Sequence, residues 1–421
     1  MTVRLSDRDR ALLSGEAGPA ARMAMSIVSR MADVGDAPEL MDITAAHIDS
    51  ALYLGEATLA FAERLAGMGG KVAVPSTSNV SGLDEHGWQD WAVPPAWAAK
   101  ARRQMVAYQS MGCIPMWTCA PYQTKHKPVF GQQIAWGESN AICFANSVIG
   151  ARTERYPDLM DICAAITARV PATGLHLEEN RGGQDLIRLS GIPKSLMATD
   201  AFYPVLGHLV GKFAQDRIPV IEGLDAAPAE DQLKALCAAT ACSGAVALLH
   251  VVGITPEAPT LAAAFRGKAP ERTLTVTFDD LKAARRELTT VTDAPLDLVV
   301  LGSPHFSLAE FRALAPRLLG RRRDPKVEFL VTTSRIMAAL AKADGLLDPL
   351  EAFGGRVSVD ACILTMPMLG AGTKTLMTNS AKYAYYSPGL LGTGVAFGST
   401  ADCVESAVTG TIVRDESAWN G

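Results

Sequence analysis

The segment "DLVVLGSPHFSLAEFRALAPRLLG", residues 297–320, decides the fold class. Its first apolar run predicts a strand, and the Gly-Ser-Pro of residues 302–304 predicts the turn that ends this strand. Residues 307–320 then carry apolar side chains at helical spacing. A strand that leads directly into a helix is the repeating unit of proteins with parallel sheets, so the segment predicts an α/β fold.

The same alternation extends to both sides of this segment. We expect a helix at "DQLKALCAATA" (231–241), a strand at "AVALLHVVG" (245–253), and a strand followed by a helix at "LTVTFDDLKAARREL" (274–288). "VEFLVTTSR" (327–335) predicts a further strand that ends in polar residues. Ligands of open α/β sheets bind at the carboxyl ends of the strands, so the loops after these strands are candidate sites.

The N-terminal part of the chain reads as a helical lobe. Residues 21–34 place apolar side chains on one helical face, and residues 42–70 suggest further helix that ends at glycines. "KVAVPSTSN" (71–79) then predicts a short buried strand followed by a polar loop. Loops of this kind frequently hold ligands, so this loop is a candidate substrate site.

Composition limits the class of function. The chain has 421 residues, 48% of them hydrophobic and 20% charged, so it can bury a large core and is longer than most single domains. The net charge is only -5, and the basic run at residues 321–326 is isolated, which argues against a nucleic-acid partner. The start lacks an apolar signal core, and no run reaches the ~18 apolar residues of a membrane span. We therefore expect a cytoplasmic protein that acts on small molecules and has no membrane partner.

Eight cysteines occur without regular spacing and without a CxxC pair, which argues against disulfides. Two of them, Cys113 and Cys119, lie six residues apart in "MGCIPMWTCAPYQTKHKP" (111–128). Buried cysteines are most often ordinary core residues, so spacing alone leaves open whether either one binds a metal. The chain contains no nucleotide-binding glycine motif, no HExxH and no GxSxG.

Three longer segments carry a resemblance to a known family. Residues 118–159, 174–183 and 301–311 closely resemble the catalytic large subunit of aconitase X, an iron-sulfur dehydratase branch of the aconitase superfamily. The likeness extends from residue 12 to residue 386, and "WGESNAICFANSVIGART" is its most specific run. It implies an aconitase-like multi-domain catalytic core, made of three domains.

The resemblance also implies a further, small swivelling domain, which is fused in some members and a separate subunit in others. We expect a separately encoded small subunit here and hence a heterodimer. We predict that residues 1–421 divide into a helical and α/β lobe (1–200), an α/β domain (200–300) and an α/β domain with the cluster site (300–421).

In the family, three cysteines in "TCAPY", "GCPH" and "DTC" contexts hold the cluster. The matching positions here are Cys119, Ser303 and Cys362, so a hydroxyl replaces the middle thiol. Thiolates are the soft ligands that iron–sulfur clusters use, and serine is a harder one. The expected cofactor is therefore an iron–sulfur cluster, with [2Fe–2S] as one form, or a mononuclear iron. Cys113 is then a packing residue.

The resemblance singles out Glu138, Ser139 and Lys382 as catalytic residues. Without it, Glu138 reads equally well as a helix cap and Lys382 as a solvated lysine. The catalytic base stays unassigned, because in this superfamily it can lie on the small subunit. The expected substrate-binding residues are His47, Asp49, Thr77, Ser78, Asn79, Asp84, Asn140 and His305.

Two substrates are associated with the family. One is cis-3-hydroxy-L-proline, which is dehydrated to an enamine that relaxes to 1-pyrroline-2-carboxylate, and the other is mevalonate 5-phosphate. The candidate loops contain few cations beyond Lys382, so the sequence favours the amino acid over the phosphorylated substrate. The alternative from a different class of function is a non-catalytic binding or scaffold subunit that has lost its cluster.

Overall fold

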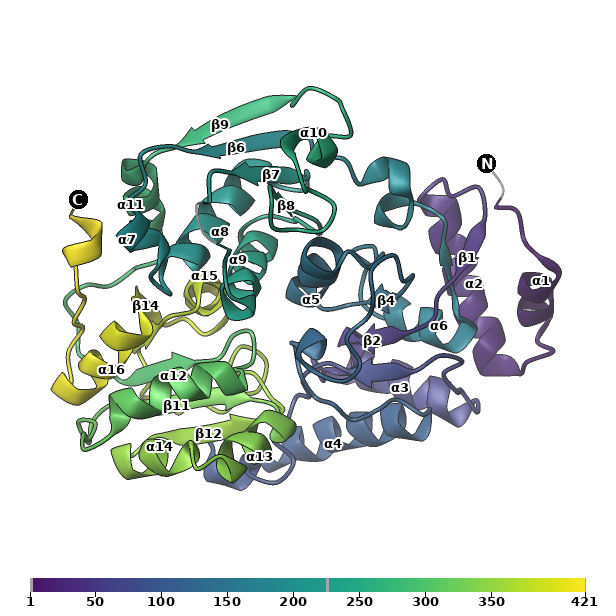
Figure 1. The fold of residues 1–421 in the computed structure, drawn as a ribbon. Coiled ribbons are helices and arrows are strands. Elements are labelled where there is room, and N and C mark those ends of the chain that lie inside the picture. The colour runs from purple at the N-terminus through teal and green to yellow at the C-terminus, as the bar shows by residue number, and fades with distance from the viewer. Residues whose placement is uncertain (1–2, 225–226, 421) are drawn as a thin grey trace.

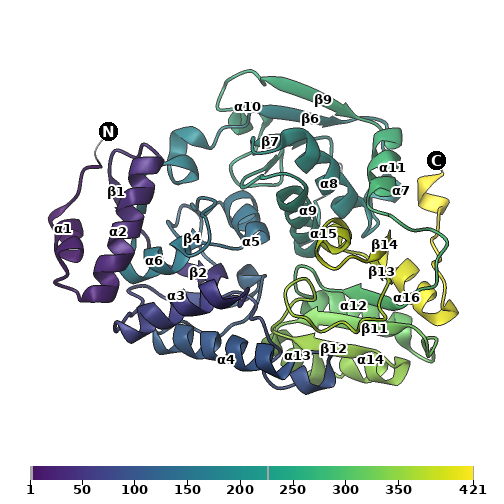
Figure 2. The same cartoon turned by 180° about the vertical axis from the view of Figure 1, so that it is seen from behind.

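The computed structural model describes residues 3–224 and 227–420, and three parallel sheets organise this part of the chain (Figure 1). They have three, four and five strands, and a two-stranded antiparallel pair accompanies the first. Seen from behind, the N-terminal helices lie at one end of the molecule and the C-terminus at the other (Figure 2). The predicted multi-domain α/β fold is confirmed.

The N-terminal region contains the three-stranded sheet and the helices around it. Its elements are α1 (Asp7–Ser14), α2 (Pro19–Val34), β1 (Leu40–Asp42), β2 (Ala46–Ile48), α3 (Glu56–Gly67), β3 (Ser76–Ser78), α4 (Pro95–Ser110), β4 (Ala135–Trp136), α5 (Ser139–Phe144), α6 (Met160–Thr167) and β5 (Arg169–Pro171).

The middle region contains the four-stranded sheet. Its elements are β6 (Asp185–Leu189), α7 (Lys194–Met197), α8 (Phe202–Ala214), β7 (Pro219–Glu222), α9 (Glu230–Ser243), β8 (His250–Val251), α10 (Leu261–Ala264), β9 (Arg272–Val276) and α11 (Phe278–Glu287).

The C-terminal region contains the five-stranded sheet. Its elements are β10 (Leu298–Leu301), α12 (Leu308–Leu318), β11 (Glu328–Thr333), α13 (Arg335–Ala343), α14 (Leu347–Phe353), β12 (Arg356–Val359), β13 (Thr375–Thr378), α15 (Ala381–Leu390), β14 (Gly394–Phe397) and α16 (Thr400–Thr409). The division proposed at residues 200 and 300 stays a prediction.

Strand β10 lies in the middle of the order β12-β11-β10-β13-β14. Its four residues are all buried, because both faces of the sheet are covered. Val299 and Leu301 pack into one hydrophobic cluster with α12 and α14, whereas Leu298 and Val300 pack into the large central core. The continuous apolar run is thus the pattern of a central parallel strand.

Two N-terminal predictions were wrong in detail. Residues 42–70 are helical only in α3 (Glu56–Gly67), and the preceding residues form β2 and a single 3-10 turn. Short apolar runs do not distinguish a buried strand from a helix, and burial of Ala46 and Ile48 within the sheet decides the outcome. The strand predicted over 71–79 is β3, whose three residues are the polar Ser-Thr-Ser rather than the apolar residues before them.

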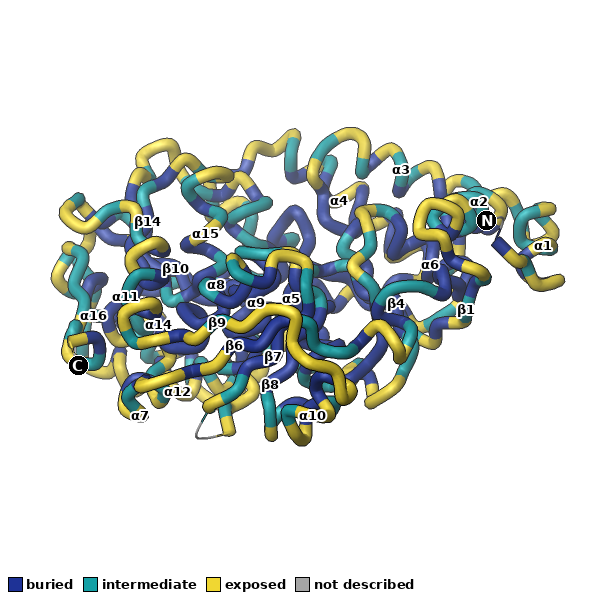
Figure 3. The backbone as a smooth tube through the Cα atoms, turned by 90° about the horizontal axis from the view of Figure 1, so that it is seen from above, coloured by how far each residue is buried: buried dark blue, intermediate teal, exposed yellow. Residues whose placement is uncertain are grey.

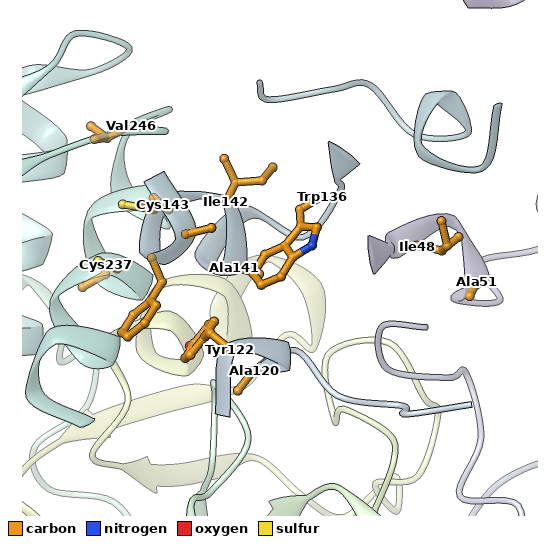
Figure 4. Close-up of a cluster of buried hydrophobic side chains, with 14 of the residues drawn as sticks. Ile48, Ala51, Ala120, Tyr122, Trp136, Ala141, Ile142, Cys143, Cys237 and Val246 are labelled. Carbon is orange, nitrogen blue, oxygen red and sulfur yellow. The ribbon is translucent and has the colours of Figure 1, made fainter. Parts of the chain in front are cut away.

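Helix α9 occupies the middle of the molecule and contacts α5, α8 and α15. Figure 3 shows that the buried part of the chain runs through this centre, while α1 and β9 are largely exposed. In the close-up of Figure 4, Cys143 of α5 and Cys237 of α9 lie side by side in the core between the two helices. The core thereby fixes α5, and with it the residues at its N-terminus, against the middle region.

In the described part of the chain, every helix is too short or too polar to cross a membrane.

Candidate active site

The carboxyl ends of three parallel strands form one wall of the site. β2, β3 and β4 pair in the order β3-β2-β4, and the residues that follow them include Asp49, Asn79 and Glu138. Parallel strands end at the same edge of a sheet, so three segments distant in sequence place their polar groups together.

His47, Thr77, Asn79 and Asp49 form a connected polar group at this edge. The imidazole Nδ1 of His47 lies 2.8 Å from Thr77 Oγ1, and the Asn79 amide donates a hydrogen bond to Asp49. Burial lowers the pKa of His47 to about 3, so its ring is neutral. Burial and the nearby Glu138 and Asp161 carboxylates raise the pKa of Asp49 to about 7.

Gly137 allows this edge to close. A Cβ at residue 137 would lie 2.7 Å from Asp49 Cβ and 2.8 Å from Asp161 Oδ2, closer than real Cβ contacts. Asp161 in turn accepts hydrogen bonds from the backbone and side chain of Ser50, at 2.9 and 2.6 Å. The absence of a side chain at 137 therefore lets β4 approach the loop that carries Asp49.

We expect Gly137→Ala to lower kcat at least tenfold and to destabilise the fold by about 1–3 kcal/mol, because the new Cβ pushes Asp49 away. Gly389→Ala is the matched control, since a Cβ there meets nothing within 4 Å and lies in helix α15. The control should leave kcat unchanged. Equal activities and melting temperatures of the two variants would contradict the close approach.

Glu138 contacts several of the residues that form this wall. It is buried, caps α5 by accepting the Ala141 N–H at 2.8 Å, and also accepts from the Asn140 amide. Asn140 continues outward, because its amide donates to the Cys119 carbonyl at 2.8 Å and its Oδ1 accepts from Tyr122 at 2.7 Å. The helix-cap alternative for Glu138 is thus realised, together with the contacts that make it more than a cap.

Lys382 reaches Glu138 from the opposite sheet. It lies in the first turn of α15, just after β13, and forms an ion pair with the Glu138 carboxylate. Burial lowers the pKa of Lys382, but the Glu138 charge outweighs burial, so its pKa lies above the ordinary value. The solvated-lysine reading is therefore wrong: the side chain is only 14% exposed. Ser139 lies beside the pair, with Oγ 3.4 Å from Glu138 Oε1.

The two candidate thiol ligands meet between the sheets. Cys119 and Cys362 pack in one small apolar cluster with Leu52 and Val80. His305 joins the two segments: its backbone N–H donates to Cys119 Sγ at 3.2 Å, and its Nε2 donates to the Ala361 carbonyl at 3.1 Å. Burial and the Glu138 charge together raise the pKa of the Cys119 thiol to about 12.

The donor chemistry of this place fits an iron-type cofactor. Two soft thiols from distant segments lie in an apolar surrounding, and Ser303 lies two residues before His305 at the carboxyl end of β10. In residues 3–224 and 227–420 no three His, Cys, Asp or Glu side chains are grouped as a complete metal site, so two thiols and a hydroxyl are the available donors. Cys113 is buried in the large hydrophobic core.

The Ser303 turn is held by its neighbours. The Ser303 carbonyl accepts a hydrogen bond from Ser380, the residue that caps α15. Gly302 has a φ of +103°, and a Cβ there would lie 2.1 Å from the Thr332 carbonyl oxygen, so only glycine fits before Ser303. Ser303 and Lys382 also line a cavity of about 480 Å³.

Asp84 lies apart from this group. Its carboxylate accepts hydrogen bonds from the backbone N–H groups of His86, Gly87 and Val359, at 3.3, 2.9 and 3.2 Å. These bonds tie the loop after β3 to the end of β12, three residues before Cys362. The Asp84 side chain therefore holds the segment that leads to Cys362 and does not face the other candidate residues.

Sequence reasoning missed several buried polar residues of the site. Asp161 was not marked by any pattern, although it supports the loop of Asp49. Tyr383 neighbours Lys382 in "SAKYAYY", and its hydroxyl lies 2.8 Å from Thr332 Oγ1 and 3.8 Å from Cys362 Sγ. Lys234 of α9 is buried, forms ion pairs with Asp231 (2.8 Å) and Glu310, and donates to the His305 carbonyl at 3.3 Å.

Comparison with known proteins identifies the family. Models described as the first, second and third domains of aconitase X match residues 2–179, 184–286 and 296–409. A cis-3-hydroxy-L-proline dehydratase from Pseudomonas aeruginosa is 48% identical over 99% of this chain and 72% of its own length. The phosphomevalonate dehydratase large subunit of Methanothermobacter thermautotrophicus is 36% identical over 93% of this chain and 95% of its own length.

A crystal structure of Thermococcus kodakaraensis aconitase X in its holo form superposes with a TM-score of 0.86. It is 31% identical and covers 96% of this chain and 100% of its own. The fold, the domain models and the curated relatives thus agree with the resemblance found in the sequence. The chain belongs to the aconitase X family and is a dehydratase, a hydro-lyase.

Proposed function

We propose that the chain dehydrates cis-3-hydroxy-L-proline to 1-pyrroline-2-carboxylate. The observation that carries the proposal is the buried ion pair of Glu138 and Lys382 beside the two thiols Cys119 and Cys362. This arrangement brings a fixed pair of charges and two thiol ligands for a metal into one buried place. Elimination of a hydroxyl group near a carboxylate requires both kinds of group. The Pseudomonas relative, which bears this activity in its name, supports the choice of substrate.

The residues of this chain have distinct tasks in the proposal. The Lys382 ammonium, fixed by Glu138, attracts the substrate carboxylate and stabilises the charge that develops as the proton beside it leaves. Ser139 offers a hydroxyl at the same helix terminus, and Asn140 holds the Glu138 carboxylate in place beside it. The neutral rings of His47 and His305 orient the substrate without adding charge. Thr77, Ser78 and Asn79 lie at the end of the neighbouring strand β3.

An iron-type cofactor completes the site in this proposal. Cys119, Cys362 and the Ser303 hydroxyl would hold it, either as an iron–sulfur cluster, [2Fe–2S] included, or as a single iron. When bound, it supplies a Lewis acid that polarises the carbon–oxygen bond of the substrate hydroxyl.

We also propose a small swivelling-domain partner that supplies the base for the proton beside the carboxylate. The Methanothermobacter large subunit, which this chain covers over 95% of its length, supports a division into two subunits and hence a heterodimer. The eight cysteines are all free, which fits a reducing compartment, so we place the protein in the cytoplasm.

Dehydration of mevalonate 5-phosphate is the second candidate, because phosphomevalonate dehydratase large subunits are also relatives. The pairing of the buried lysines favours the first candidate. Lys234 is already paired with Asp231 and Glu310, and Lys382 brings a single positive charge that Glu138 partly neutralises, which suits a substrate carboxylate better than a phosphate dianion.

The test uses the chain purified anaerobically together with its small subunit. Iron and sulfide are measured, and the complex is then incubated separately with cis-3-hydroxy-L-proline and with mevalonate 5-phosphate. Release of 1-pyrroline-2-carboxylate from the first alone supports the proposal, and sulfide with the iron identifies a cluster rather than a single iron. Turnover of the phosphorylated substrate alone supports the second candidate. Absence of both turnover and iron supports a scaffold subunit that has lost its cluster.

A further inference from the structure

Asp49 is the one acidic side chain at the strand edge that keeps an open oxygen. It follows β2 directly and is partly exposed, unlike Glu138 and Asp161. Its Oδ1 accepts the Asn79 amide, whereas its Oδ2 has no hydrogen-bond partner among the described residues. By contrast, the Glu138 carboxylate is filled by a helix N–H, an amide and an ammonium. A carboxyl with one anchored and one open oxygen is held in place yet free to exchange a proton.

The charges around Asp49 favour its protonated form. Glu138 faces it from the end of β4, Asp161 from α6 and Asp158 from the loop before α6, and all three are acidic. His47, two residues earlier on β2, stays neutral because it is buried. In residues 3–224 and 227–420 no lysine, arginine or histidine forms an ion pair with Asp49. Its pKa of about 7 leaves Asp49 protonated in about half of the molecules at neutral pH.

Unpartnered polar atoms occur on residues of the same strand edge as Asp49. Asn79, whose amide nitrogen anchors Asp49, is 2% exposed, and its Oδ1 has no partner in the described residues. The same holds for His47 Nε2 on β2, the strand that Asp49 follows, and for Ser78 Oγ on the neighbouring β3, both fully buried. Buried polar groups normally find partners, so the orphaned Asn79 Oδ1 and His47 Nε2 beside Asp49 indicate a place where a polar ligand binds. Asp49 therefore faces a ligand site.

We propose that Asp49 is the general acid that protonates the hydroxyl of the substrate as it departs; this inference rests on the proposed function. The C2–H bond breaks, and its proton passes to the base on the proposed small subunit and from there to solvent. The electron pair forms the C2=C3 double bond, the C3–O bond breaks, and the oxygen takes the Asp49 proton to leave as water. Asp49 regains a proton from solvent before the next turnover.

Hydroxide is a poor leaving group, and a positioned acid increases the rate of its departure by about 10²–10⁴-fold. If Asp49 only oriented Asn79, its replacement would change substrate binding and would leave the departure of the hydroxyl group unaffected. The two roles are therefore separated by a substrate whose leaving group needs no proton.

The experiment compares wild type and Asp49→Asn, each in complex with the small subunit, on cis-3-hydroxy-L-proline and on its cis-3-chloro analogue. Asparagine keeps the shape and the polarity but has no proton to give. We expect the variant to lose at least 100-fold in kcat on the hydroxyl substrate with little change in KM. On the chloro analogue, which expels chloride, its kcat should stay within threefold of wild type.

Retention of hydroxyl turnover within threefold, or an equal loss on both substrates, would overturn the assignment of Asp49. Failure of the wild type on hydroxyproline would instead reject the proposed function, so the two failures are distinguishable. The pH profile is an independent measurement: kcat of the wild type on the hydroxyl substrate should fall as pH rises through about 7, because the acid form is required. A flat profile between pH 6 and 9 would also reject the proposal.

Discussion

Lys382→Met is expected to abolish activity and to cost about 3–5 kcal/mol of folding free energy. The change keeps the length of the side chain but leaves the Glu138 carboxylate buried without its cation. Removing one partner of a buried ion pair is strongly destabilising, because the remaining charge has lost its compensation. Urea unfolding gives the free energy, and the hydroxyproline assay gives the activity.

A double variant of this ion pair separates the effect of the lost charge from the effect of altered packing. The double variant Lys382→Met, Glu138→Gln removes both charges, so it should be more stable than the single variant while remaining inactive. Lys100→Met is the matched control, since the Lys100–Glu56 ion pair lies on the exposed surface and should leave stability and activity unchanged. A Lys382→Met protein as stable as wild type would show that the pair is solvated rather than buried.

Cys119→Ala and Cys362→Ala are each expected to remove the iron and all turnover, because each takes away one of two soft donors. Iron content per chain and the visible absorption spectrum are the measurements, made on the complex isolated anaerobically. Cys113→Ala is the control: it lies six residues from Cys119, is buried in the core, and should keep its iron. Full iron content in either site variant would exclude that cysteine as a ligand.

The sequence predicted the helix–strand alternation well where an element is long. The helix over 231–241 is confirmed as α9, and the strand–turn–helix of residues 297–320 is confirmed as β10 and α12. It failed at β3, whose Ser-Thr-Ser has no apolar pattern and forms a strand because β2 pairs with it. Tertiary pairing of this kind is not encoded in local spacing.

The dependence on tertiary contacts also explains why some site residues were predicted from the sequence and others were not. Glu138 and Lys382 lie in runs that carry the family resemblance, whereas Lys234 lies in an ordinary amphipathic helix pattern. A lysine on such a helix is normally solvated. Lys234 is buried because Glu310, which is 76 residues away, closes over it, and no single-segment pattern contains that partner.

The two proposed thiol ligands follow strands of two different sheets, so they are synthesised at different times. Cys119 leaves the ribosome 243 residues before Cys362, and Lys382 follows Glu138 by 244 residues. At ordinary rates of translation this interval lasts roughly 10–50 s, during which the N-terminal sheet can fold but holds only half of the site. For the proposed iron site, loading therefore follows synthesis of Cys362, and a chain arrested before β12 would display Cys119 as a lone thiol beside an uncompensated Glu138.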